Sequence, residues 1–140
     1  MTTQERMTAH GIKPSALRLH IYDYLDSHRT HPTVDDIYSD LVGSYPTLSK
    51  TTVYNTVKLL AEHGIIKAIA IEGFRTRYDA NAVFHGHFLC RTCGKVYDVF
   101  TIDCPPFPES GFQVEAQDVY YSGCCKSCLN NNKKNNTVKE

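Results

Sequence analysis

The hydrophobic and polar residues in the first half of the chain recur with the period of an α-helix and predict a helical start. Over residues 13–28 the apolar side chains form a stripe at helical spacing, which indicates an amphipathic helix that buries one face. The stripe consists of Leu17, Ile21, Tyr24 and Leu25. A second helix is predicted to begin after Thr33, a candidate N-cap with Asp36 three residues on.

A third helix is predicted from a cap at Ser49 to about His63, with Gly64 in the usual C-terminal position. Its buried face is predicted to carry Val53, Val57, Leu60 and Ala61. The opposite face carries Thr51, Tyr54, Asn55 and Lys58. Hydroxyl, phenol, amide and ammonium groups on one face can reach base edges and phosphates together, although a merely solvated face would look the same.

Residues 65–78 change from a helical to an extended pattern. Two runs of β-forming residues flank the Glu72-Gly73 turn, so a β-hairpin is predicted, and its second arm is basic. Short helices followed by a basic hairpin form a winged helix-turn-helix, in which the third helix enters the major groove and the hairpin lies near the backbone or minor groove. The predicted DNA contacts are Lys13, Arg18, Lys50, Thr51, Thr52, Tyr54, Asn55, Lys58, Arg75 and Arg77.

The second half of the chain is predicted to be a small second domain of the α/β type over residues 84–128, joined to the first domain by a hinge at 79–83. The predicted strands cover residues 84–89, 96–100, 111–115 and 118–121. Three prolines between the second and third of these strands exclude a helix there. Residues 129–140 are too polar to pack and predict a disordered tail. The fold class is therefore α+β, with the winged helix-turn-helix over residues 1–78.

Two cysteine pairs share the same spacing, and together they predict a closed tetrahedral zinc site. The predicted ligands are Cys90, Cys93, Cys125 and Cys128. Four thiolates leave no open coordination position, so the site would be structural. Cys124 is an alternative ligand, although the two-residue spacing favours its neighbour. Cys104 precedes a proline, and such a pair can supply a thiolate to haem, so Cys104 is a redox or haem candidate beside the simpler interpretation of a loop cysteine.

Composition and charge narrow the classes of protein. With 41% apolar residues, the 140-residue chain can build the cores of one or two small domains. It has no run long enough to span a membrane and no apolar signal segment, so a cytoplasmic protein with reduced, metal-binding thiols is predicted. The net charge of zero gives no general support for DNA binding, but residues 50–78 hold five basic and two acidic residues. Any DNA affinity must come from that local surface, doubled in a dimer.

The predicted strand at 84–89 carries two histidines, two residues apart. If it is extended, His85 and His87 point to one face and Cys90 to the other, so one strand would contribute to two different metal sites. The imidazoles then need oxygen or nitrogen partners from elsewhere in the chain.

Several spaced motifs together resemble the ferric uptake regulator family. They are His31-Pro32-Thr33 with Asp35-Asp36-Ile37-Tyr38, Thr52-Val53-Tyr54-Asn55, Arg77-Tyr78-Asp79, the His85-x-His87 pair and both cysteine pairs. The resemblance implies a cytoplasmic, homodimeric, metal-dependent repressor that binds a palindromic operator in double-stranded DNA. It also implies a regulatory Fe²⁺ or Mn²⁺ ion on His31, Asp79, His85, His87 and Asp98, with structural Zn²⁺ on the four cysteines.

Three imidazoles and two carboxylates form a shell that suits Fe²⁺ or Mn²⁺ and can leave a sixth position open. Because the five ligands come from both domains, metal binding would clamp the hinge and shift the population toward one DNA-binding geometry. Asp79 and Asp98 stand where iron sensors commonly carry glutamate, which implies the peroxide-sensing branch of the family. In that branch a ligating histidine is oxidised, and His31 and His85 are the candidates.

Other functions remain open. An iron-, zinc- or haem-responsive regulator of the same family would use the same chain, with Cys104 as the haem candidate. A structural zinc-binding interaction module is a different class that the cysteine pairs also allow. An enzyme is not predicted, because no nucleophile or acid–base pair lies beside the ligands in sequence. The proline-rich segment 104–108 stands near the usual place of a helix in the family's dimerisation domain, which puts the dimer geometry in question.

Overall fold

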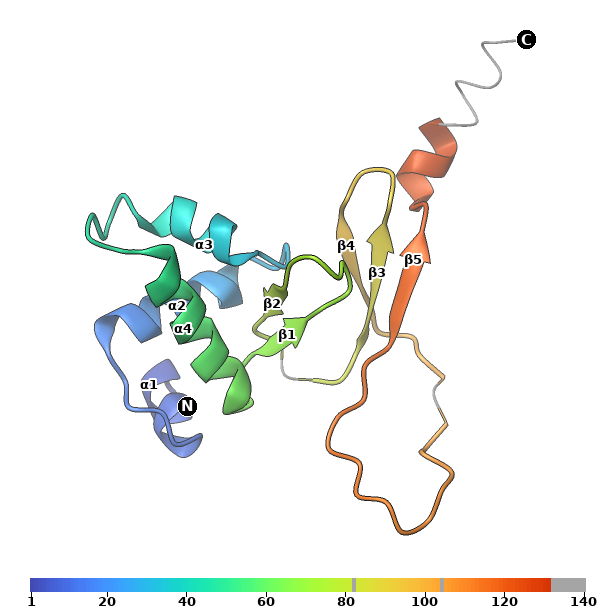
Figure 1. Cartoon of the computed structure of the whole chain (residues 1–140), viewed down its shortest axis with the longest axis horizontal. Coiled ribbons are helices and arrows are strands. Elements are labelled where there is room, and N and C mark those ends of the chain that lie inside the picture. Colours follow the sequence, from blue (N-terminus) through green and yellow to red (C-terminus); the bar gives the residue numbers. More distant parts are fainter. Residues whose placement is uncertain (82, 104, 132–140) are drawn as a thin grey trace. The chain divides into compact units, whose positions relative to one another are not determined.

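The computed structural model describes residues 1–81, 83–103 and 105–131, so the hinge residue Ala82 and the haem candidate Cys104 lie outside the described residues. The chain divides into two compact units, Met1–Val83 and Phe84–Glu140. Helices dominate the described part of the first unit and a small sheet that of the second (Figure 1), which confirms the predicted α+β class. No helix among these residues is both long and apolar enough to cross a membrane.

The first unit is a group of helices followed by a hairpin. Its elements are α1 (Thr3–Ala9), α2 (Ala16–Ser27), α3 (Val34–Leu41), α4 (Lys50–Glu62), β1 (Lys67–Ile69) and β2 (Arg77–Asp79). The predicted caps are present, because the Thr33 hydroxyl accepts the N–H of Asp36, whose carboxylate accepts the N–H of Thr33, and Ser49 caps α4. Helix α1, which begins with a capping box of Thr2 and Glu5, is not among the helices predicted from the sequence.

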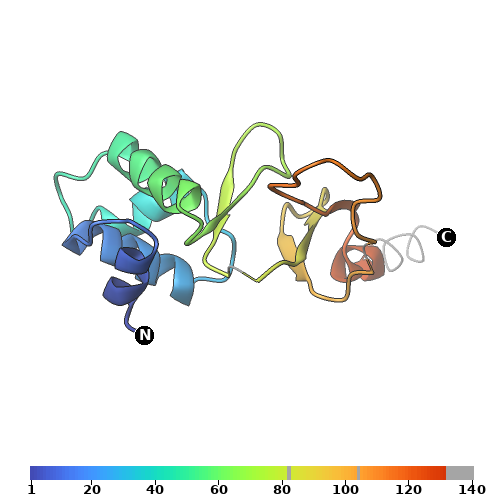
Figure 2. The same ribbon diagram turned by 90° about the horizontal axis from the view of Figure 1, so that it is seen from below.

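The apolar faces of these helices meet in one core. Ile21 and Leu25 of α2 are buried there with Val53, Val57 and Leu60 of α4, which confirms the predicted inward faces. The opposite face of α4 is exposed along its length. Figure 2 shows the helices of this unit gathered together, with the hairpin extending away from them.

The hairpin is shorter than the extended pattern of residues 65–78 predicts. Antiparallel pairing of β1 with β2 places Lys67 opposite Asp79. Ile65 and Ile66, predicted as strand, instead pack into the helical core directly after α4, which leaves three residues for β1. At the other end β2 includes Asp79, a residue that the sequence pattern places in the hinge.

The second unit holds a three-stranded sheet in the order β4–β3–β5 (Figure 1). Its strands are β3 (Gly86–Cys90), β4 (Val96–Val99) and β5 (Tyr120–Gly123). The central β3 runs antiparallel to β4 and parallel to β5. The strand predicted at 111–115 is wrong: these residues lack strand pairing, and Phe112 and Val114 are exposed. Strand-forming residues become a strand only where a neighbouring strand pairs with them, and among the described residues no strand pairs with this segment.

The end of the chain is more ordered than its polarity suggests. Residues 126–131 are helical, and the N–H of Leu129 donates to the carbonyl of Cys125 at 2.9 Å. The predicted disorder is therefore wrong for residues 129–131, while 132–140 lie outside the described residues. The helical turn begins at the second cysteine pair and places Cys125 and Cys128 on one face, a local constraint that composition alone does not reveal.

Candidate metal centres and nucleic-acid interface

Four cysteines of the second unit form a compact cluster. Their Sγ atoms all lie within 4.8 Å of one another, with 3.8 Å from Cys90 to Cys128 and 3.9 Å from Cys93 to Cys125. Four sulfurs bound to one zinc ion at about 2.3 Å in a tetrahedron are about 3.8 Å apart, whereas disulfide sulfurs are about 2.05 Å apart. The cluster therefore has the dimensions of a tetrahedral metal site and not of a pair of disulfides.

Backbone N–H groups favour the thiolate form in this cluster. The N–H groups of Cys93 and Cys125 donate to Sγ of Cys90 at 3.4 and 3.3 Å, and these bonds lower the pKa of Cys90 to about 5. A hydrogen bond from Tyr97 similarly lowers the pKa of Cys125. A hydrogen bond with Cys125, followed by burial, raises the pKa of Cys128. Thiolates favoured in this way are the form of cysteine that binds metal.

Cys124 lies next to this cluster but is not a member of it. Its Sγ accepts a hydrogen bond from the hydroxyl of Thr92 at 3.6 Å, and the four mutually close sulfurs found among the described residues do not include it. The geometry therefore selects Cys125 from the two adjacent cysteines.

The same strand of the second unit carries the paired histidines. The register of β3 and β4 sets His87 opposite Asp98. The Nε2 atoms of His85 and His87 lie 2.9 and 3.4 Å from Oδ1 of Asp98, and the two rings are 4.5 Å apart. Phe100 stacks on His85 with a centroid distance of 5.0 Å. Two imidazole nitrogens and one carboxylate oxygen thus converge on one point, as metal ligands do.

The first unit carries a second pair of candidate ligands. Nε2 of His31 lies 3.6 Å from Oδ2 of Asp79, and both side chains are buried. His31 has a left-handed backbone with φ of 59°, which costs about 1–3 kcal/mol in a residue with a side chain. Such strain persists only where surrounding contacts hold it, and it is concentrated at binding sites. Arg29 approaches the other oxygen of Asp79, with its Nη1 4.0 Å from Oδ1.

The predicted DNA contacts on α4 form an exposed surface. Its residues are Lys50, Thr51, Thr52, Tyr54, Asn55 and Lys58. Lys50 lies 3.2 Å from the carboxylate of Asp35 and over the ring of Tyr38, so its charge is partly compensated. Of the predicted contacts before α2, Lys13 is exposed, and its carbonyl accepts a hydrogen bond from Arg18 at 2.7 Å.

The two hairpin arginines have different surroundings. Both pair with the carboxylate of Glu72, Arg75 at 3.0–3.1 Å and Arg77 through a short bond from its Nε. The side chain of Arg75 is 45% exposed, whereas that of Arg77 is 11% exposed and donates to the carbonyl of His31 at 3.1 Å. Arg75 is thus presented to solvent and Arg77 is held inside the unit. The sequence signal for this ion pair is Glu72, an acidic residue three positions before Arg75 and five positions before Arg77.

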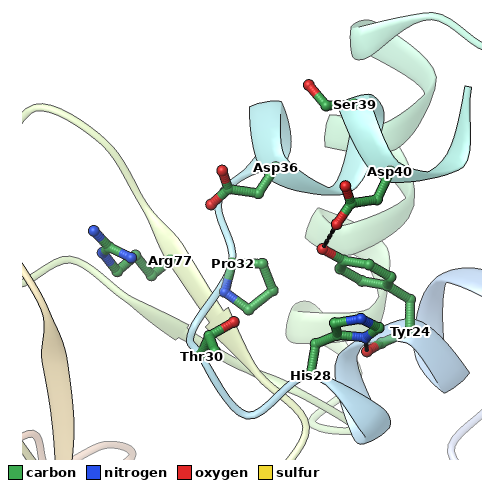
Figure 3. A pocket seen from close by; sticks show the side chains of 8 residues that line it. All are labelled: Tyr24, His28, Thr30, Pro32, Asp36, Ser39, Asp40 and Arg77. Atoms are coloured by element: carbon green, nitrogen blue, oxygen red, sulfur yellow. Dashed lines mark hydrogen bonds between the residues drawn. The ribbon is translucent and has the colours of Figure 1, made fainter.

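A polar cavity of about 400 Å³ lies beside the chain neighbours of His31 (Figure 3). Its lining consists of Tyr24, His28, Thr30, Pro32, Asp36, Ser39, Asp40 and Arg77. The hydroxyl of Tyr24 donates to Asp40 at 2.5 Å, His28 stacks on Tyr24 at 4.1 Å, and Asp36 caps α3. Burial, followed by the bond to Asp40, raises the pKa of Tyr24. These contacts give the acidic groups of the cavity structural roles.

The Glu72 ion pair predicts a pH-dependent contribution to stability. Burial would raise the pKa of Glu72, but the hydrogen bonds from Arg75 and Arg77 outweigh it and hold the pKa below its usual value. A carboxylate with a lowered folded-state pKa stabilises the fold above its unfolded pKa of about 4.3, and this contribution is lost as pH falls through the folded value. Glu72→Gln should therefore lower the free energy of unfolding at pH 7 by about 1.5–3 kcal/mol.

Urea unfolding of wild type and Glu72→Gln at a series of pH values measures this difference. It should shrink as pH falls below about 4.3. Glu62→Gln at the exposed end of α4 is the control and should differ little from wild type at any pH. A constant difference between wild type and Glu72→Gln across the series would contradict the assignment.

Comparisons with known proteins agree with this geometry. The profile of the ferric uptake regulator family matches residues 9–105. The peroxide operon regulator of Bacillus subtilis (strain 168) is 31% identical over 129 residues, covering 89% of this chain and 89% of its own. The peroxide-responsive repressor PerR of Staphylococcus aureus (strain Mu50) is 32% identical over 126 residues, covering 84% of this chain and 83% of its own.

Solved structures show the same fold. The ferric uptake regulator from Pseudomonas aeruginosa with manganese superposes with a TM-score of 0.68 at 19% identity, covering 90% of this chain and 99% of that one. PerR from Streptococcus pyogenes superposes with a TM-score of 0.51 at 27% identity, covering 89% of this chain and 88% of that one. These relatives are regulators and not enzymes. With its winged-helix unit, its cysteine cluster and its matched profile, this chain belongs to the ferric uptake regulator family.

Proposed function

We propose that the protein is a metal-dependent transcriptional repressor that binds a palindromic operator in double-stranded DNA as a homodimer in the cytoplasm. The observation that carries the proposal is that each unit holds a group of buried or partly buried side chains able to bind the same kind of metal ion. His31 and Asp79 form one group, and His85, His87 and Asp98 form the other. A single Fe²⁺ or Mn²⁺ ion bound by both groups would have a nitrogen and oxygen shell of the kind these metals accept.

Such an ion would act on the hinge between the units. An ion that binds residues of both units stabilises the inter-unit angle in which all five ligands reach it, and so shifts the population toward that angle. In a dimer the angle sets the spacing of the two α4 helices, which must match two half-sites about one helical turn of DNA apart. Metal occupancy would thereby decide operator affinity.

The cysteine cluster has a different role in this proposal. Zn²⁺ on Cys90, Cys93, Cys125 and Cys128 would be structural, because all four positions of the tetrahedron are taken by protein ligands. The ion would join the end of β3 to the helix at 126–131 and contribute to the folding of the second unit.

Peroxide is the proposed signal. Two observations support it: both proposed regulatory carboxylates are aspartates, Asp79 and Asp98, and the relatives from Bacillus subtilis and Staphylococcus aureus are named as peroxide regulators. On exposure of the Fe²⁺-loaded protein to peroxide, His31 or His85 would gain an oxygen atom from the peroxide and would no longer bind the metal. The protein would then dissociate from the DNA. Mass spectrometry of peptides from Fe²⁺-loaded and Mn²⁺-loaded protein treated with peroxide tests this step, and oxidation absent from both histidines would leave an iron- or manganese-responsive regulator.

Substitutions on α4 test the DNA-binding function. A duplex selected from a random library with Mn²⁺-loaded wild type serves as the probe. Tyr54→Ala and Lys58→Ala should each lower affinity by about tenfold, since base and phosphate contacts are worth about 1–3 kcal/mol. Lys58→Ala should also reduce the salt dependence of binding by about one unit of slope.

Glu62→Ala, on the same helix but outside the predicted surface, is the matched control and should bind like wild type. Wild-type affinity in both Tyr54→Ala and Lys58→Ala, or affinity that Mn²⁺ leaves unchanged, would favour a structural zinc-binding interaction module instead.

A further inference from the structure

The side chain of Arg77 joins two parts of the winged-helix unit. Its Nε donates to the carboxylate of Glu72 in the hairpin turn, and its Nη1 donates to the carbonyl of His31 at 3.1 Å. The side chains of Arg77 and Glu72 are only 11% and 6% exposed. A guanidinium held on both sides and covered in this way is poorly placed to contact DNA, although it lies in the basic arm of the hairpin.

The backbone around His31 is attached to the same strand. The N–H of Tyr78 donates to the carbonyl of Pro32 at 3.0 Å, and an isolated antiparallel bridge pairs Thr33 with Arg77. The left-handed conformation of His31 is therefore held from β2, and the Arg77 side chain supplies the bond to the carbonyl of His31 itself. Figure 3 shows Arg77 beside the segment of Thr30 and Pro32.

We propose that Arg77 is a positioning residue that couples the metal ligand His31 to the hairpin, a role that rests on the proposed metal-dependent function. Coordination of an ion by His31 would restrain the imidazole ring and, through the strained backbone, the direction of the His31 carbonyl. Arg77 passes that restraint to Glu72, which also holds Arg75. Metal occupancy thereby orders the hairpin turn and the exposed guanidinium of Arg75.

This route lies wholly inside the first unit, so it acts separately from any change at the hinge. It also requires arginine. A guanidinium offers several N–H donors in a rigid fork and can hold Glu72 and the His31 carbonyl together, whereas an ammonium on a flexible stem keeps the charge but loses the fork. Arg75 provides the matched comparison. Its Nε and Nη2 donate to the same carboxylate, and among the described residues it makes no hydrogen bond to His31.

Hydrogen–deuterium exchange of the zinc-loaded full chain, with and without Mn²⁺, measures the coupling in the hairpin. In wild type, Mn²⁺ should slow exchange over residues 70–78 by about tenfold, within the usual range of coupling between two sites. In Arg77→Lys the effect of Mn²⁺ should fall below about twofold, while Mn²⁺ itself still binds. Arg75→Lys should keep most of the effect. Glu72→Gln leaves the bond from Arg77 to His31 in place but should also lose the effect of Mn²⁺ on exchange. This variant serves as the test if Arg77→Lys does not fold.

The outcomes separate this inference from the proposed function. Failure of wild type to bind Mn²⁺ would overturn both. Mn²⁺ binding that leaves the wild-type hairpin unprotected overturns only the coupling, and so does protection that survives in Arg77→Lys and Glu72→Gln. If Arg75→Lys and Arg77→Lys lost the Mn²⁺ protection of the hairpin equally, the coupling would also be overturned, since the bond to His31 would then make no difference.

Discussion

Cys125→Ser is expected to release the metal from the cysteine cluster and to unfold the second unit. Structural zinc sites contribute roughly 10–16 kcal/mol of apparent binding free energy in small peptides, comparable with the whole stability of a domain at about 5–15 kcal/mol. The small core of the second unit is the reason for this expectation. Among its described residues the buried apolar side chains are Cys90, Val96 and Cys125, so two of the three are themselves ligands. So small a core cannot hold a three-stranded sheet without another contribution.

Cys124→Ser provides the matched control for this expectation. The residue is adjacent in sequence, yet its sulfur lies outside the cluster and contacts Thr92. Metal content by elemental analysis, with thermal unfolding followed by circular dichroism, should show one zinc per chain in wild type and Cys124→Ser and none in Cys125→Ser. Retention of zinc by Cys125→Ser, or its loss from Cys124→Ser, would show that the ligand set is assigned wrongly.

His87→Ala is expected to remove the metal dependence of DNA binding while the fold persists. His87 is fully buried, and its Nε2 shares the oxygen of Asp98 with His85, so its loss removes a central ligand. Mutation of a residue that only hydrogen-bonds to a metal ligand lowers metal affinity by about 10–100-fold. Loss of the ligand itself should therefore weaken Mn²⁺ binding by at least about 100-fold. Operator affinity with Mn²⁺ should then fall to the metal-free level.

Mn²⁺ titration by electron paramagnetic resonance, alongside operator binding, measures both effects. His20→Ala is the control, because His20 is exposed on α2 and packs edge-on against Tyr45 at 5.3 Å. It should retain wild-type Mn²⁺ affinity and DNA binding. Unchanged metal-dependent DNA binding in His87→Ala would remove the paired histidines from the regulatory mechanism.

The features that could be predicted from the sequence are those set by short-range chemistry. The caps of α3 and α4, the inward face of α4 and the cysteine spacing follow from residues a few positions apart. The alternation along β3 also follows, because His87 and Cys90 separate onto two clusters as the strand period requires.

The features that could not be predicted depend on partners distant in sequence. The segment 111–115 has strand-forming residues but lacks strand pairing in the structure, and Leu129–Asn131, which belong to the largely polar end of the chain, continue the helical turn that follows the second cysteine pair. The basic arm of the predicted hairpin gives Arg75 and Arg77 the same DNA-contacting role, whereas in the structure Arg77 donates to the backbone of His31, 46 residues earlier. Such a contact leaves no periodic trace in the sequence.

The central claim is that one ion is bound by residues of both units. Pulsed electron paramagnetic resonance of Mn²⁺-loaded protein counts the imidazole nitrogens around the metal. Three imidazole nitrogens are expected in wild type and two in His31→Ala, with weaker Mn²⁺ binding in the variant. Two nitrogens in wild type, unchanged by His31→Ala, would mean that the ion is held by the second unit alone and would contradict the claim.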